Sequence, residues 1–199
     1  MAKESPNRAA PSTDSARDIL DLTVETNLLV GEDGNVNVNA YELRNALLQQ
    51  RREARVRYDN GVTLPANAKK LRADAARAVR HSRTLARNIK NATGAAKHVE
   101  ADAHHIVAAG DKRAGRARGF LFRWGIGIND SDNGVYLPKK WSSQVPGLED
   151  ATAHEVIHTT EYHLAVTARL ALTKPSNQAS GRATLKDIRY DILNNDFDY

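Results

Sequence analysis

Three short stretches of the sequence carry residue types that could do chemistry. EADAHHIVAAG, residues 100–110, places His104 and His105 side by side in a chain with seven histidines. HEVIHTTEYH, residues 154–163, adds three more histidines, and DNGVYLP, residues 132–138, lies between the two stretches. Neutral imidazole is a good ligand for divalent ions such as Zn and Ni. The histidines therefore predict a metal site.

The spacing of His154 and His158 favours a shared ion. On a helix, or at the turn that enters one, side chains four residues apart point the same way, within reach of one metal. Two ligands make a weak site, so we expect a third from His104 or His105. Adjacent residues of a strand point to opposite faces. We therefore expect one of this pair to bind the metal and the other, with a pKa near neutrality, to take a proton from water.

HEVIH also matches the H-E-x-x-H pattern of zinc metalloproteases, in which His154 and His158 would bind zinc and Glu155 would be the general base. The extended form of that pattern requires glycine at the position of Glu161 and histidine at that of Leu164. The chain has neither, and it contains no glutamate after Glu161 that could serve as a distant ligand. A zinc protease remains an alternative, but it leaves AHHIV and DNGVYLP unexplained.

The charge is unevenly distributed, with a net value of +5. Residues 1–95 hold 16 Lys and Arg against 11 Asp and Glu, whereas residues 96–199 hold 13 of each. The excess of positive charge in residues 1–95 favours an anionic partner such as nucleic acid, although a solvated helix surface explains this charge as well. A non-catalytic nucleic-acid-binding protein, with affinity following the cations of residues 69–90, is therefore a third alternative.

Composition narrows the remaining possibilities. The chain has no cysteine, which excludes disulfides and thiolate metal sites. No apolar run is long enough to cross a bilayer, and the polar residues 1–15 show no Sec signal. We expect synthesis in the cytoplasm, followed by any export through a route that needs no cleaved signal.

Periodicity and capping residues predict mostly helices with a small β element. Helices are expected over residues 13–31, 40–58 and 66–92, with Gly94 ending the third. A strand is expected within 97–107, a basic helix over 111–125, and a second strand ending at Pro138. Thr159 is expected to cap a helix that runs to residue 172, followed by a linker over 174–183 and a last helix over 184–193.

Three segments in order, DAHHIVAAG, RWGIGINDSDNGVYLP and HEVIHTTEYHLAV, resemble the AHH group of HNH/endonuclease VII-type nucleases. The resemblance spans about residues 99–172. It implies a ββα-metal (His-Me finger) nuclease core, and such nucleases are often toxin domains of bacterial polymorphic toxins and secreted effectors. The chain departs from the pattern at Ala108, where the group often has proline, and at Glu155, where a small residue is more usual.

The resemblance also implies roles for individual residues. His104 resembles the first metal ligand, and His105 resembles the general base that activates water. His154 and His158 resemble the metal ligands from the helix side.

Two asparagines and several cations complete the expected site. Asn133 resembles the loop asparagine that orients the base, with Asn129 the second candidate, whereas His163 matches no fixed role. Gly134 is expected to supply a positive φ at a turn. Five cations between the motifs are candidate contacts to the nucleic-acid backbone, although a solvated helix face explains them equally. They are Lys112, Arg113, Arg116, Arg118 and Arg123.

The sequence as a whole predicts a mainly α fold with a small β element, made of an N-terminal helical region and a ββα-metal nuclease core. The expected segments are a disordered N-terminus over 1–12, a helical region over 13–95, the nuclease domain over 96–174, and a linker and C-terminal helix with an acidic tail over 175–199.

The predicted function is metal-dependent endonuclease cleavage of nucleic acid, DNA before RNA, with one divalent ion that could be Mg, Mn, Zn or Ni. The resemblance further implies a bacterial antibacterial toxin or effector that is secreted or delivered into target cells. Its partners would then be DNA or RNA, an immunity protein, and a secretion adaptor or chaperone.

Overall fold

The computed structural model describes residues 41–46, 48, 55–173 and 177–199. The chain divides into two compact units, Met1–Glu53 and Ala54–Tyr199. The disordered segment expected at 1–12 and the helix expected at 13–31 lie outside the described residues. The helix expected over 40–58 is helical at 41–46 and 48, but its expected end is wrong, since residues 55–58 are not helical and Tyr58 lies in a strand. The boundary expected at residue 95 falls inside the second unit, because the helix before it packs on the strands that follow.

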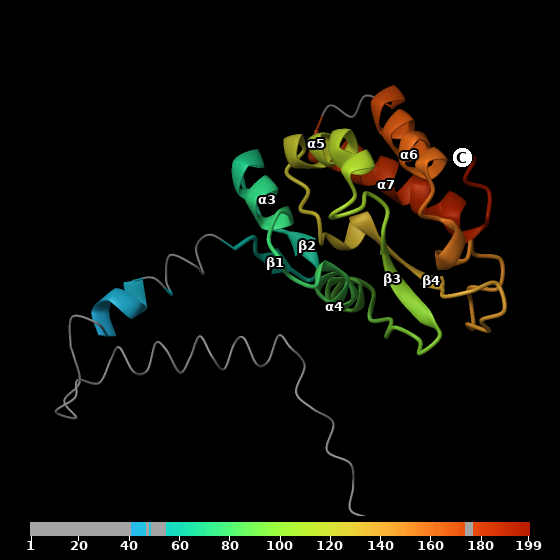
Figure 1. Cartoon of the computed structure of the whole chain (residues 1–199), viewed down its shortest axis with the longest axis horizontal. Helices are drawn as coiled ribbons and strands as arrows, with labels where there is room; N and C mark the ends of the chain where they lie inside the picture. The colour runs from blue at the N-terminus through green and yellow to red at the C-terminus, as the bar shows by residue number, and fades with distance from the viewer. Residues whose placement is uncertain (1–40, 47, 49–54, 174–176) are drawn as a thin grey trace, which may run out of the picture. The chain divides into compact units, whose positions relative to one another are not determined.

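The second unit is mainly α-helical with two small antiparallel sheets, which confirms the expected fold class (Figure 1). Short 3-10 turns cover Lys112–Ala114, Ser131–Asn133 and His154–Val156. The helices and strands in chain order are β1 (Tyr58–Asp59), β2 (Val62–Thr63), α3 (Ala68–Ala75), α4 (His81–Thr93), β3 (Ala101–His105), α5 (Gly115–Arg123), β4 (Gly134–Pro138), α6 (Thr160–Leu172) and α7 (Gln178–Leu193). Within the described part of the chain, every helix is too short or too polar to span a bilayer.

The pairing of β3 with β4 brings the first two motifs together. The strands are antiparallel, with His104 opposite Val135 and His105 opposite Gly134. Both strands lie where the sequence predicts them, and β4 ends at Pro138 as expected. The two histidines therefore stand at the end of a short ladder, beside the loop that enters β4.

Helix α4 packs closely against this ladder. Leu85 and Ile89 are buried with Ala103 of β3 in one apolar cluster. A Cβ added to Gly134 would lie only 2.6 Å from Leu85 Cδ1, so the missing side chain is what admits the helix. The positive φ predicted for Gly134 is wrong, since its φ is −132°. The glycine serves close packing instead.

The single helix predicted over 66–92 is also wrong, because the chain breaks between α3 and α4. In a continuous helix the Arg77 carbonyl would accept the backbone N–H of His81. Here Nε2–H of the His81 ring donates to that carbonyl at 3.2 Å. The backbone N–H of His81 donates to the Val79 carbonyl instead. The break leaves the His81 side chain at the start of α4, facing the loop before β4.

Helix α7 holds the same loop from the other side. Arg182 bonds Asp130 at 2.8 Å and Asp132 at 2.7 Å, and Asp130 is fully buried. The backbone N–H of Thr63 donates to the Asp130 carboxylate at 2.7 Å, which ties the β1–β2 hairpin to the same point. Because breaking a buried ion pair is costly, these bonds fix the loop firmly.

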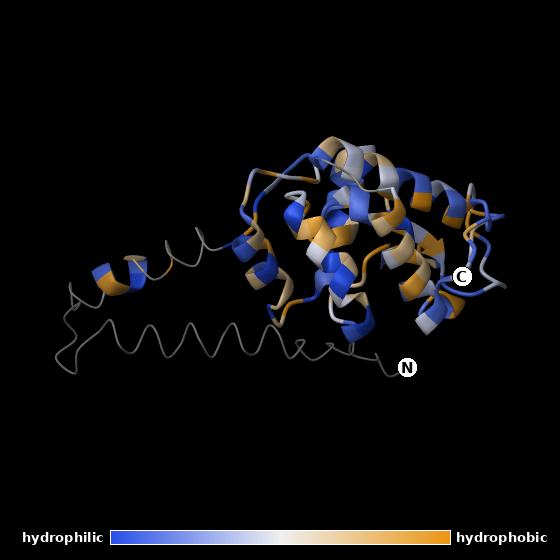
Figure 2. Ribbon diagram, turned by 90° about the horizontal axis from the view of Figure 1, so that it is seen from above, coloured by the Kyte–Doolittle hydropathy of each residue, from blue (hydrophilic) through white to orange (hydrophobic). Residues whose placement is uncertain are grey.

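Helix α7 begins earlier than the sequence predicts. Asn177 and Ser180 form a capping box, so the helix starts at Gln178, inside the expected linker. Tyr162 of α6 and Ile188 of α7 are both fully buried in the main core. Figure 2 shows hydrophobic and hydrophilic residues interleaved along the helices of the second unit, as amphipathic helices on a shared core require.

Candidate active site

Three histidines from separate elements converge on one point. His104 comes from β3, His154 from a 3-10 turn, and His158 from the connection that leads into α6. One ring nitrogen from each lies within 4.8 Å of the others, close enough to hold a single metal ion. His104 is buried, whereas His158 is exposed, so the cluster opens to solvent on the His158 side.

Hydrogen bonding fixes the tautomer of His104 in the form that a ligand needs. Tyr162 donates its hydroxyl hydrogen to the Ile106 carbonyl at 3.0 Å, so its oxygen accepts from His104 Nε2–H at 2.9 Å. The proton therefore sits on Nε2, and Nδ1 keeps its lone pair. That Nδ1 atom is buried and has no hydrogen-bond partner among the described residues. A buried acceptor without a partner is unfavourable, and a metal ion would satisfy it.

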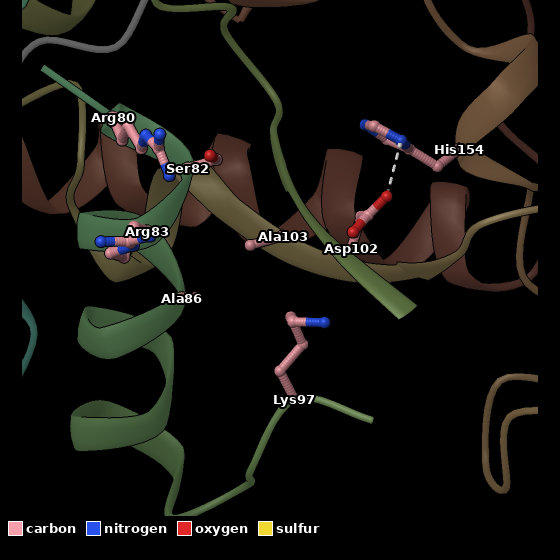
Figure 3. A pocket seen from close by; sticks show the side chains of 8 residues that line it. All are labelled: Arg80, Ser82, Arg83, Ala86, Lys97, Asp102, Ala103 and His154. Atoms are coloured by element: carbon pink, nitrogen blue, oxygen red, sulfur yellow. Dashed lines mark ion pairs between the residues drawn. The ribbon is translucent and has the colours of Figure 1, made fainter. Parts of the chain in front are cut away.

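Asp102 stands behind His154, the second candidate ligand. Its Oδ2 lies 3.6 Å from His154 Nδ1 (Figure 3), while His154 Nε2 lies 3.0 Å from His158 Nε2. Metal-binding histidines commonly direct their other ring nitrogen to a carboxylate in this way. Asp102 was not predicted from the sequence, although it lies two residues before His104 and therefore on the same face of β3.

Burial keeps the cluster neutral. It lowers the pKa of His104 well below its ordinary value, and the neighbouring His154 and His158 lower it further. Burial also lowers the pKa of His154, which His158 lowers further and Asp102 opposes. Partial loss of solvent around the ring also lowers the pKa of His158, and Asp111 opposes this shift. Unprotonated imidazole is the form that binds metal, so the three nitrogens are ready to coordinate at neutral pH.

His105 points to a different set of partners. Its Nε2–H donates to Asn129 Oδ1 at 3.1 Å, which leaves Nδ1 as the unprotonated nitrogen. Asn129 Nδ2 lies 3.0 Å from His81 Nδ1, and His81 Nε2–H donates to the Arg77 carbonyl. Burial lowers the pKa of His105 to about 4, although its hydrogen bond to Asn129 raises it, so the pKa lies below the near-neutral value expected from the sequence. His105 is therefore a neutral, oriented base at pH 7.

The contact expected of Asn133 is made by Asn129. The Asn133 side chain is fully buried, where its Oδ1 accepts from Val107 N at 2.8 Å and its Nδ2 donates to Ile128 O at 2.8 Å. Asn133 thus fixes the backbone on both sides of the site. Asn129 is held in turn by Asn88 of α4, which donates to its carbonyl at 2.7 Å.

Two of the five cations expected to contact the nucleic-acid backbone are instead bonded to other groups of the protein. Arg113 pairs with Asp111 at 2.6 Å and donates to the His158 carbonyl at 3.3 Å, so it holds the segment that carries a candidate ligand. Arg118 donates to the Ala108 and Asp111 carbonyls. The other three are exposed on and before α5, namely Lys112, Arg116 and Arg123.

His163 and Glu155 stand apart from the cluster. His163 is buried, with Nε2 3.3 Å from Asp111 Oδ2, so it belongs to the Asp111–Arg113 contact. Glu155 accepts from the Trp141 backbone N–H at 3.2 Å. The HEVIH stretch is a 3-10 turn and a connection rather than one α-helix, so the backbone differs from the helix that the protease alternative requires.

The histidine cluster makes stability depend on pH in the metal-free protein. In the unfolded chain these rings take up protons near their ordinary pKa of about 6.5, whereas the folded protein resists protonation. The unfolded state therefore binds more protons in acid, and we expect the free energy of unfolding to fall as pH drops below about 6.5. Urea unfolding in EDTA between pH 5 and 8 measures this.

The variant His104→Ala provides the comparison. It is less stable at every pH because a buried ring is lost. Its free energy of unfolding should fall less steeply in acid, because one histidine whose pKa is lowered by folding has been removed. Equal slopes for the two proteins would contradict this account of His104.

Comparison with known proteins adds one finding. A family model described as AHH, a nuclease family of the HNH/ENDO VII superfamily with conserved AHH, matches residues 85–194, more than half of the chain. The match includes all three converging histidines and His105, and it begins after His81. No curated protein and no solved structure matches.

Proposed function

The chain belongs to the AHH nuclease family of the HNH/ENDO VII superfamily, and from this premise we propose that it is a metal-dependent endonuclease acting on DNA in preference to RNA. The observation that carries the proposal is the convergence of His104, His154 and His158 within 4.8 Å, with the neutral His105 next to it on β3. As a nuclease, the protein takes nucleic acid as its substrate.

The residues of the cluster fit a resident divalent ion. Three neutral imidazoles, one with a buried nitrogen that lacks a partner, form a nitrogen donor set that favours Zn or Ni over the oxygen-seeking Mg and Mn. When bound, such an ion supplies positive charge to the phosphate oxygens as the P–O bond breaks. Tyr162 and Asp102 keep His104 and His154 in the required orientation.

His105 acts as the general base. Its Nδ1 takes a proton from the attacking water, and its Nε2–H stays bonded to Asn129 Oδ1 throughout. Asn129 cannot rotate freely, because its side-chain Nδ2 donates to His81 Nδ1 and its backbone carbonyl accepts from the side chain of Asn88. We assign the orienting role to Asn129, and to Asn133 the role of a backbone support.

We place this activity in bacterial antagonism, as a toxin or effector delivered into target cells. The support is the resemblance of the three motifs to toxin nucleases. A producing cell then needs an immunity protein, and delivery needs a secretion adaptor or chaperone.

The test is cleavage of plasmid DNA and total RNA by the purified protein. We expect EDTA-sensitive nicking that returns when Zn or Ni is added, with faster cleavage of DNA. A protein that cleaves neither polymer with Mg, Mn, Zn or Ni would refute the nuclease proposal. Cleavage of a peptide library by the same sample would favour the zinc protease alternative.

A further inference from the structure

A pocket of about 450 Å³ lies between α4 and β3. Figure 3 shows α4 along one side, β3 with Asp102 and Ala103 along the other, and Lys97 on the segment that joins them. His154, a member of the candidate metal cluster, also lines the pocket. The full lining is Arg80, Ser82, Arg83, Ala86, Lys97, Asp102, Ala103 and His154.

The lining is strongly basic. It holds three cations, Arg80, Arg83 and Lys97, against one carboxylate, Asp102. That carboxylate faces His154 at 3.6 Å, so part of its charge is directed to the cluster. Lys97 is fixed in place, because its ammonium donates to the Ala101 carbonyl at 2.6 Å and to the His98 carbonyl at 3.1 Å. The pocket therefore presents a net positive charge next to the candidate metal site, with Lys97 held in place.

We propose that this pocket binds a phosphate of the nucleic-acid strand adjacent to the scissile phosphate. The inference rests on the proposed function, because the scissile phosphate is placed at the histidine cluster. Since His154 belongs to both the cluster and the pocket wall, a strand held at the cluster can extend directly into the pocket. Arginine and lysine side chains bind phosphate without reading bases, so binding here is indifferent to sequence.

The pocket differs from the basic surface predicted between the nuclease motifs, and its cations Arg80 and Arg83 belong instead to the residues 69–90 named in the third alternative. The exposed cations Lys112, Arg116 and Arg123 lie on and before α5, and none of them lines the pocket. The pocket cations come from α4 and the segment before β3, and they share a wall with the cluster. We therefore assign the phosphate adjacent to the cleaved bond to the α4 side.

The experiment measures oligonucleotide binding against salt concentration in the cleavage-deficient His105→Ala protein. Each lost phosphate contact reduces the salt slope by about 1. We expect Arg83→Ala to show this reduction and to weaken the binding of unrelated sequences equally, and Arg83→Lys to restore much of it. Arg72→Ala on α3 is the matched control, since it removes the same charge from an exposed site outside the pocket.

Equal salt slopes for Arg83→Ala and Arg72→Ala would overturn the pocket assignment. Cleavage by the protein with His105 intact separates this outcome from failure of the proposed function. If that protein cleaves and the slopes are equal, only the pocket is wrong. If it cleaves neither DNA nor RNA with any metal, the proposed function fails, and the pocket assignment fails with it.

Discussion

Replacing His105 with alanine is expected to lower kcat for nucleic-acid cleavage by about 1,000-fold, within the range for loss of a general base. Because His105 Nε2–H donates to Asn129, the other ring nitrogen, Nδ1, is unprotonated and can accept a proton. The pKa of about 4 keeps the ring neutral at pH 7. KM and metal affinity should change little, since His105 is not part of the converging cluster. Steady-state kinetics with bound-metal analysis measures all three quantities.

Two further measurements distinguish a base from a structural residue. Added imidazole should restore part of the activity of His105→Ala, because a small base can enter the space left by the ring. Glu155→Ala is the control, since its carboxylate bonds the Trp141 backbone and stands apart from the cluster. Loss of nucleic-acid cleavage in Glu155→Ala with normal cleavage in His105→Ala would contradict the assignment of His105 and would make Glu155 the base instead.

The histidines could be found from the sequence because their signals are local. A spacing of four residues in HEVIH and the adjacency in AHH each limit where the side chains can point. The structure brings together the three histidines that were predicted as ligands, and it separates His105 from them. Residues that support the site gave weaker signals or none. From the sequence Tyr162 is either a packing residue or a phosphate contact, and only the fold places its hydroxyl between His104 and Ile106.

The choice between Asn129 and Asn133 illustrates what the sequence does not contain. Both lie in the loop before β4, and which one faces His105 depends on the path of that loop. The path is set by Asp130, which bonds Thr63 and Arg182, residues far away in the sequence. The break before α4 has a similar origin, because His81 reaches Asn129 across 48 positions. Such long-range contacts override helix periodicity.

Replacing His104 with alanine is expected to weaken binding of Zn or Ni by more than about 100-fold, beyond the range for loss of a residue that only supports a ligand. His104 supplies the buried nitrogen that has no other partner among the described residues, and it is the only one of the three predicted ligands that β3 provides. Competition with a coloured chelator measures the affinity directly and does not require activity.

Tyr162→Phe tests whether the tautomer of His104 matters. It removes only the oxygen that accepts His104 Nε2–H, so we expect a smaller loss of affinity, about 10-fold, within the range for residues that orient a ligand. His98→Ala is the control, because His98 is exposed and outside the cluster, and its affinity should match the unmodified protein. Unchanged affinity in His104→Ala would remove His104 from the ligand set. Equal losses in His104→Ala and Tyr162→Phe would instead mean that the imidazole binds metal only when the tyrosine holds its tautomer.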